Sequence, residues 1–284
     1  MYRIAKKKKL TAAVTQMEIE APLVAKKAQP GQFIILRVDE NGERIPLTIA
    51  GFNREEGTVK IIFQIVGSTT AMLAEKEEGD FIQDFVGPLG VATETKDLKK
   101  VCVIGGGVGC AIALPVAEEL TACGASVTSI IGFRNSENVI LRDEFSESSE
   151  KLILMTDDGS CGERGNVADA LRKLLENGEK FDRIIAIGPL IMMKSVVAAA
   201  KPYSIPVTVS MNPIMIDGTG MCGGCRLTLI QNGKKVTKFA CVDGPDFDGY
   251  EVDFDEAMAR SGSYRSFEKR EREKNCRLFG AKAN

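Results

Sequence analysis

Three cysteines and one aspartate are grouped in the last third of the 284-residue chain. Asp217 precedes Cys222 with four residues between them. Cys225 follows after two more residues, and Cys241 after a further fifteen. Two thiolates separated by two residues can bind one metal centre, and glycines in the same segment let backbone N–H groups point at sulfur. The third thiolate comes after a predicted hairpin, in which an Asn-Gly pair favours the turn.

The spacing of these residues indicates an iron–sulfur cluster. Plant-type ferredoxins bind a [2Fe–2S] cluster with Cys-x4-Cys-x2-Cys and one distant cysteine. The same spacing occurs here with an aspartate in first position, so we predict that the ligands are Asp217, Cys222, Cys225 and Cys241. Structural zinc is one alternative, because three thiolates and a carboxylate also suit a tetrahedral zinc ion. The alternative for Asp217 is that it is an ordinary turn residue and binds no metal.

Histidine is absent from the chain, which narrows the chemistry that it can perform. Ser–His and Cys–His dyads, histidine zinc sites and histidine general bases are excluded. Lys and Arg number 37 against 39 Asp and Glu, so a strongly basic nucleic-acid binder is excluded too. No apolar run reaches the ~18 residues of a membrane span, and the first residues do not resemble an export signal. We therefore expect a cytoplasmic protein that has no membrane or nucleic-acid partner.

The chain has eight cysteines, and without an export signal they are not expected to form a disulfide framework. Three of them stand apart from the metal motif among apolar neighbours. We interpret Cys102, Cys110 and Cys123 as small core residues.

A glycine-rich turn lies between a predicted buried strand at 101–104 and a predicted helix. Gly106, Gly107, Val108 and Gly109 would let a pyrophosphate approach the backbone amides at the helix N-terminus. The run departs from Gly-x-Gly-x-x-Gly, and no acidic residue for a ribose stands where that pattern expects one. The glycine-rich turn alone is therefore only a moderately specific sign of dinucleotide binding.

The elements that must position these residues fall into three regions, a β-barrel plus an α/β domain and a small module. Residues 1–98 contain short strands separated by turns, which is typical of a small β-barrel. Residues 99–210 alternate strands with helices, which predicts a doubly wound parallel sheet with helices on both faces. Residues 211–284 would form the cluster module and a C-terminal tail. We interpret acidic segment 243–256 and basic segment 259–284 as a solvated turn and a surface helix, with a docking surface for a partner as the alternative.

The order of the motifs resembles the ferredoxin–NADP reductase superfamily. Arg-x-Pro-Leu-Thr at 44–48 is followed by Gly-x-x-Thr at 67–70, Gly-Pro-Leu-Gly at 87–90, the glycine turn and Ile-Gly-Pro at 187–189. Two groups in this superfamily share a C-terminal [2Fe–2S] module. One is the electron-transfer subunit of dihydroorotate dehydrogenase type B, which uses four cysteines. The other is the small subunit of the electron-bifurcating NADH-dependent reduced ferredoxin:NADP oxidoreductase, also described as a sulfide dehydrogenase subunit. With Asp217 at the first ligand position, the chain resembles this second group more closely.

The resemblance implies cofactor contacts in the first two regions. FAD would be bound by Arg44, Pro46, Leu47, Thr48, Ile65, Val66, Gly67, Thr70 and Gly87. NAD(H) would be bound by Gly106, Gly107, Val108, Gly109, Arg134, Asp157, Gly188 and Pro189. Arg134 would also suit a 2′-phosphate, so NADP(H) stays open as the alternative.

The function that the resemblance implies is that of a flavin-dependent NAD(P)H oxidoreductase subunit. FAD would exchange hydride with NAD(H), and the cluster would pass single electrons to a larger subunit with its own FAD and [4Fe–4S] clusters. Ferredoxin would be reached through that complex. A flavin belongs between the nicotinamide and the cluster, because the nicotinamide gives electrons in pairs and the cluster takes them singly. The alternatives are electron supply to dihydroorotate dehydrogenase, a sulfide dehydrogenase subunit, and a non-enzymatic tether built on zinc.

Overall fold

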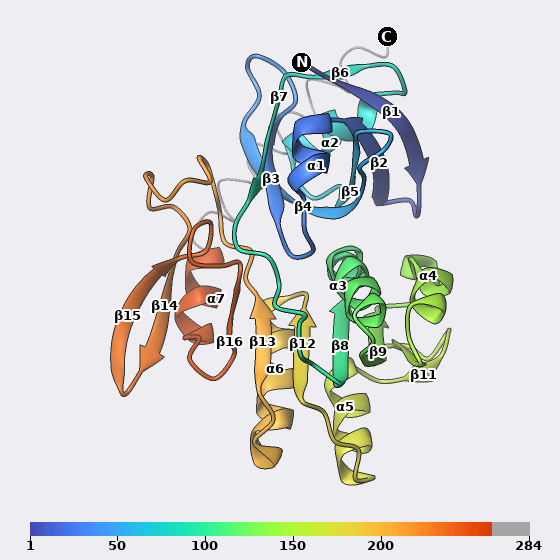
Figure 1. Ribbon diagram of the computed structural model, residues 1–284, viewed down its shortest axis with the longest axis vertical. Coiled ribbons are helices and arrows are strands. Elements are labelled where there is room, and N and C mark those ends of the chain that lie inside the picture. The colour runs from blue at the N-terminus through green and yellow to red at the C-terminus, as the bar shows by residue number, and fades with distance from the viewer. Residues whose placement is uncertain (263–284) are drawn as a thin grey trace.

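The computed structural model describes residues 1–262, which form a barrel, an α/β sheet and a small C-terminal module (Figure 1). Residues 263–284, which contain the C-terminal tail of predicted region 211–284 and most of the basic segment 259–284, lie outside the described residues. The barrel stands over the carboxyl ends of the central strands of the α/β sheet. The C-terminal module lies beside that sheet (Figure 1).

The barrel is one antiparallel sheet of seven strands in the order β6-β1-β2-β5-β4-β3-β7. Its elements are β1 Tyr2–Lys9, β2 Val14–Glu20, α1 Pro22–Lys27, β3 Phe33–Arg37, β4 Arg44–Asn53, β5 Thr58–Gln64, α2 Ser68–Glu75, β6 Phe81–Ile82 and β7 Asp84–Leu89. Alternate side chains such as Leu36 and Phe63 are buried inside it. The two edge strands β6 and β7 are joined by Gln83 alone, whose amide donates to the Arg37 carbonyl. This connection nearly closes the sheet, as the predicted barrel requires.

The α/β sheet has the strand order β11-β10-β9-β8-β12-β13-β16. Its elements are β8 Lys100–Gly106, α3 Cys110–Ala122, β9 Ser126–Phe133, α4 Arg142–Glu147, β10 Lys151–Thr156, β11 Glu163–Arg164, α5 Val167–Glu176, β12 Arg183–Ile187, α6 Leu190–Ala200, β13 Val207–Ser210 and β16 Asp246–Asp248. All pairs are parallel except β13 with β16. From β8 the chain winds outward through β9 and β10 to β11 and then returns to β12 on the other side of β8. The winding therefore reverses between β8 and β12.

Helices cover both faces of this sheet, as a doubly wound sheet predicts. On one face α3 and α4 bury Val116 and Phe145, and on the other α5 and α6 bury Leu171 and Val196. The barrel residue Ala50 belongs to the same buried cluster as Val116, so the barrel rests on α3. The predicted fold class is confirmed.

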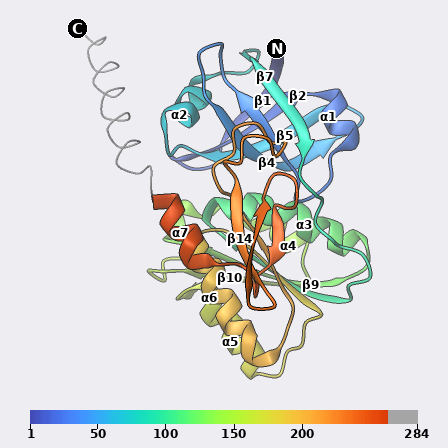
Figure 2. The ribbon, with the colours of Figure 1, turned by 90° about the vertical axis from the view of Figure 1, so that its left-hand side faces the viewer.

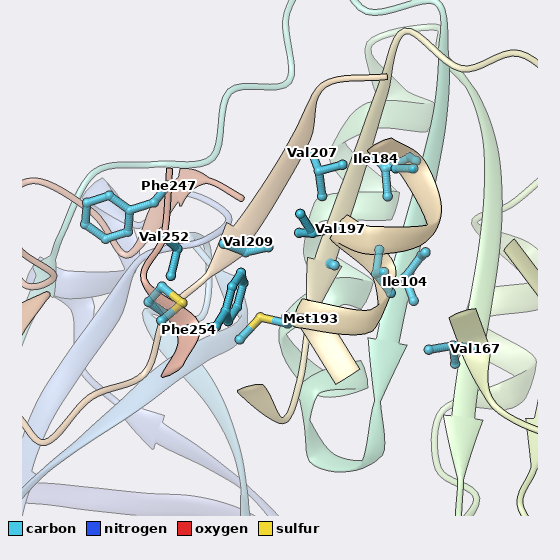
Figure 3. Packing of buried hydrophobic residues seen from close by; sticks show 14 of the residues in the cluster. Ile104, Val167, Ile184, Met193, Val197, Val207, Val209, Phe247, Val252 and Phe254 are labelled. Atoms are coloured by element: carbon cyan, nitrogen blue, oxygen red, sulfur yellow. The ribbon is translucent and has the colours of Figure 1, made fainter. Parts of the chain in front are cut away.

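The C-terminal module consists of a hairpin, β14 Arg226–Gln231 and β15 Lys234–Phe239, and of helix α7 Phe254–Gly262. The predicted Asn232-Gly233 turn is present, with positive φ angles of 51° and 75°. In Figure 2 the orange chain of this module reaches up to the barrel, while α7 stays beside α6. Phe254 is buried near Met193 and Val209, which fixes α7 to the α/β sheet (Figure 3).

Two predictions from the sequence are wrong. Cys102 and Cys110 are buried as expected, but Cys123 is exposed because it lies just beyond the end of α3. The acidic segment 243–256 is more than a solvated turn, because it contains β16 and the first turn of α7. Within residues 1–262 no helix has the length and apolar character needed to cross a membrane.

Asp246 on β16 joins the C-terminal module to the segment between barrel and sheet. Thr93 donates a hydrogen bond to its Oδ2 at 2.6 Å. Protein encloses the carboxyl group although the residue as a whole is partly exposed. This burial raises the pKa of Asp246 above its ordinary value, against the smaller opposing effect of the Thr93 and Ser210 hydroxyls.

We expect Asp246→Asn to raise the free energy of unfolding at pH 8 by about 1 kcal/mol and to make it less dependent on pH. The folded carboxyl keeps its proton to higher pH than the unfolded one, so wild-type stability falls as pH rises from the ordinary value of 3.8 through the raised one. Asparagine keeps an acceptor for Thr93 without a charge. Urea unfolding at pH 5 and pH 8 measures both effects. Asp248→Asn, on the exposed part of the same strand, is the control, and equal changes in both variants would contradict the prediction.

Candidate metal and cofactor site

Asp217 is held by the backbone that follows it. Its Oδ1 accepts a hydrogen bond from the Thr219 amide and its Oδ2 one from the Cys222 amide, both at 2.9 Å. The Thr219 bond, and more weakly the Cys222 bond, lower the pKa of Asp217 below its ordinary value. The carboxylate is thereby tied to the first of the predicted cysteine ligands.

Cys225 and Cys241 form a buried pair of free thiols. Their Sγ atoms lie 3.1 Å apart. Burial, and next the Cys225 thiol, raise the pKa of Cys241 to about 12, while the Gly220 amide opposes this shift. The Asp217 carboxylate raises the same pKa, so it lies within electrostatic reach of the buried pair.

Cys222 is exposed, and its Sγ accepts a hydrogen bond from the Gly224 amide at 3.4 Å. In the part of the chain that the structure describes, no three Cys, Asp or Glu side chains converge closely enough to hold a metal ion. The fold therefore brings Cys225 and Cys241 together and links Asp217 to Cys222 through the backbone, without directing all four side chains to one point.

The donor set fits an iron–sulfur cluster by its chemistry. Two unoxidised thiols face each other in the interior, a third stands at the rim, and the carboxylate is oriented by backbone amides. Sulfur donors with backbone N–H groups directed at sulfur are what such clusters require. The residues that would hold a cluster are Asp217, Cys222, Cys225 and Cys241.

The predicted FAD residues lie on neighbouring barrel strands. On β4 are Arg44, Pro46, Leu47 and Thr48; Ile65, Val66 and Gly67 follow β5; Thr70 is in α2 and Gly87 is on β7. Strand β3 lies between β4 and β7, where Ile35 pairs with Pro46 on one side and Val86 on the other. The Thr70 hydroxyl accepts from the amides of Val66 and Gly67 at 3.0 Å, so it fixes the turn that begins α2.

The predicted NAD(H) residues share the carboxyl edge of the α/β sheet. Gly106 ends β8, with Gly107, Val108 and Gly109 in the turn that leads into α3, and Gly188 and Pro189 directly follow β12. Arg134 and Asp157 follow β9 and β10, where the Asp157 amide donates to the Phe133 carbonyl at 3.1 Å. A Cβ on Gly109 would lie 2.4 Å from the Ile187 carbonyl oxygen, so this close approach requires glycine. The turn therefore stands where the winding reverses.

The segment 217–225, which carries three of the predicted metal ligands and is here called the ligand segment, packs against the barrel. A Cβ on Gly218 would lie 2.6 Å from Leu89 Cδ1 and 3.1 Å from Ile35 Cγ1. Ile35 also shares one buried apolar cluster with Cys225 and Cys241. Sequence reasoning did not single out Gly218 or Leu89, although the Gly-Pro-Leu-Gly motif contains Leu89.

Residues 212–253 match the family model of the iron-sulfur cluster binding domain of dihydroorotate dehydrogenase B. A homolog of the dihydroorotate dehydrogenase B (NAD(+)) electron transfer subunit from Thermotoga maritima is 47% identical over 269 residues, which cover 95% of this chain and 93% of the relative. The electron transfer subunit from Desulforamulus reducens is 31% identical over 240 residues, or 83% of this chain and 91% of the relative. The predicted iron–sulfur module is confirmed.

The fold is also that of a solved relative. A chain in the structure of the NADH-dependent reduced ferredoxin–NADP oxidoreductase, determined for insight into flavin-based electron bifurcation, is 46% identical with a TM-score of 0.89. The match covers 95% of each chain. The resemblance drawn from the order of the motifs is thereby confirmed. Since identity of this extent runs through nearly the whole of both chains, the protein belongs to the family of dihydroorotate dehydrogenase B electron transfer subunits and their homologues, within the ferredoxin reductase-like superfamily.

Proposed function

We propose that the chain is the FAD- and [2Fe–2S]-binding electron-transfer subunit of an NADH-dependent reduced ferredoxin:NADP oxidoreductase. The observation that carries the proposal is the contact of Gly218 with Leu89 and Ile35. Ile35 also pairs with Pro46 on the strand of the predicted FAD residues. Rigid packing between a ligand segment and a flavin strand suits two redox groups that must exchange electrons, because such groups work only in fixed proximity.

When bound, FAD takes a hydride from a nicotinamide and supplies electrons singly to an iron–sulfur cluster. The residues of the chain would orient these groups. Arg44 would pair with the FAD diphosphate, and Thr48 would hydrogen-bond the edge of the flavin ring. The backbone amides of Gly107 and Gly109 at the start of α3 would bind the NAD(H) pyrophosphate.

The arrangement of the α/β sheet supports the nucleotide part of the proposal. Open sheets of this kind bind nucleotides where the winding reverses, and here that point lies between β8 and β12. Gly188 and Pro189 follow β12 and would flank the nicotinamide. Arg134 and Asp157, on the strands beyond β8, would lie near the adenosine.

Exposed apolar side chains lie in and next to the loops that carry the predicted metal ligands, and they support a protein partner. They are Ile214, Ile216, Met221 and Val242, with 48%, 52%, 89% and 50% of their surfaces exposed. A group of large exposed apolar side chains around a functional loop marks a protein contact. The proposed occupant is a larger subunit with its own FAD and [4Fe–4S] clusters, which would cover exposed Cys222 and pass electrons to ferredoxin.

Electron supply to a dihydroorotate dehydrogenase is the second candidate, because the matched family model and two relatives carry that name. The partner that co-purifies with the chain separates the two candidates. A barrel-type dehydrogenase supports the second, whereas a multi-cluster flavoprotein supports the first.

The full-length chain purified without oxygen should contain about two irons and one flavin. NADH should bleach the flavin absorbance, because the barrel that would bind FAD stands over the end of the sheet that would bind NAD(H) (Figure 1). Metal analysis and anaerobic absorbance spectra measure both. A colourless protein that contains zinc and no iron would contradict the proposal and support a zinc tether.

Cys225→Ala should lose most of the bound iron and retain FAD, because it removes one of two facing buried thiols and leaves the flavin strands intact. Cys102→Ala is the matched control, since Cys102 is equally buried but lies in β8. Iron and flavin are quantified in both variants. Equal iron contents would rule out Cys225 as a ligand.

Asp217→Cys should give a cluster with a more negative midpoint potential, because a thiolate sulfur donates more electron density to iron than a carboxylate oxygen does. Redox titration of the anaerobic protein measures the shift. Equal potentials in two proteins with intact clusters would remove Asp217 as a tuning ligand.

A further inference from the structure

Helix α7 extends one side chain to the segment of predicted metal ligands. Arg260, in its last turn, donates from Nη2 to the Gly224 carbonyl at 3.4 Å. Gly224 lies between Cys222 and Cys225, and its own amide donates to Cys222 Sγ at 3.4 Å. The residue that Arg260 contacts is therefore the one whose N–H group bonds a ligand sulfur.

The start of α7 is firmly anchored, so Arg260 reaches the ligand segment from a fixed support. Asp253 caps the helix by accepting a hydrogen bond from the Glu256 amide at 3.1 Å. Phe254 is buried in the same apolar cluster as residues of α6 and β13 (Figure 3). Lys194 on α6 forms an ion pair with Asp255 at 2.6 Å.

The charge of Arg260 complements the segment that it contacts. The predicted ligands are three thiolates and a carboxylate, all negative when they bind metal. A reduced cluster carries one further negative charge, and a nearby guanidinium stabilises that form more than the oxidised one. Net charge and hydrogen bonds to sulfur are two of the factors that set the reduction potential of a cluster.

We propose that Arg260 is a positioning residue for the cluster, which holds the Gly224 amide on Cys222 Sγ and keeps the reduction potential high. The inference rests on the proposed function, because it requires a bound cluster. Neither the spacing of the cysteines nor the family match at residues 212–253 includes Arg260.

The test compares full-length wild type with Arg260→Ala, Arg260→Gln and Arg260→Lys, all purified without oxygen. Redox titration followed by electron paramagnetic resonance measures the midpoint potential and the spectrum of the cluster. Arg260→Ala should shift the potential to more negative values and change the spectrum. Arg260→Gln should recover little, since it lacks the charge, whereas Arg260→Lys should recover part of the shift. Circular dichroism verifies that each variant is folded.

Lys194→Ala is the structural control, because it breaks the ion pair of α7 with α6 without touching Gly224. Its potential should equal that of wild type. An unshifted Arg260→Ala potential, or an equal shift in Lys194→Ala, overturns the inference and leaves the proposed function standing. A wild-type protein that holds no cluster overturns the proposed function itself.

Discussion

One buried apolar cluster fixes the three parts of this molecule relative to one another. It includes Phe33 and Ile35 of the barrel, Val209 of the α/β sheet, and Cys225 and Cys241 of the C-terminal module. Since packed interiors transmit displacements instead of absorbing them, the barrel strands and the cysteine pair behave as a single rigid body. The relation between the barrel strands that carry the predicted FAD residues and the pair Cys225 and Cys241 is thus a property of the core.

The predicted ligands differ in how they are supported. Cys225 and Cys241 are part of the core, whereas Cys222 is exposed and Asp217 depends on backbone amides. Half of the donor set is therefore fixed by hydrophobic packing, and the other half by a short hydrogen-bonded loop at the surface. Such a division lets one side of the site face the barrel while the other faces solvent or a partner, which suits a group that receives electrons from one direction and releases them in another.

Much of this arrangement is visible in local sequence. Strand β8 follows from its continuous apolar run and the hairpin turn from Asn232-Gly233, and the spacing that begins at Asp217 predicts the donor set. The strand and the turn depend on neighbours within a few residues, where periodicity and turn chemistry act. The exposure of Cys123 escaped the same reasoning because one residue decides whether a position falls inside α3 or beyond its end.

Other features depend on contacts between distant residues. Thr93 and Asp246 are 153 positions apart, and their hydrogen bond explains why an acidic segment holds an enclosed carboxyl group. β16 has only three residues, too few to show a strand period. The approach of Gly218 to Leu89 and the reach of Arg260 to Gly224 likewise follow from tertiary packing alone.

The hairpin also bears on how the molecule meets other chains. Among residues 1–262, β15 pairs with β14 only, so one row of its backbone donors and acceptors is open to an added strand. Lys234, Lys235 and Lys238 lie along it, and lysines on such an edge discourage strand addition because a second chain would have to bring their charges together. Self-association through sheet extension is thereby disfavoured, and recognition between chains is left to side chains instead of backbone.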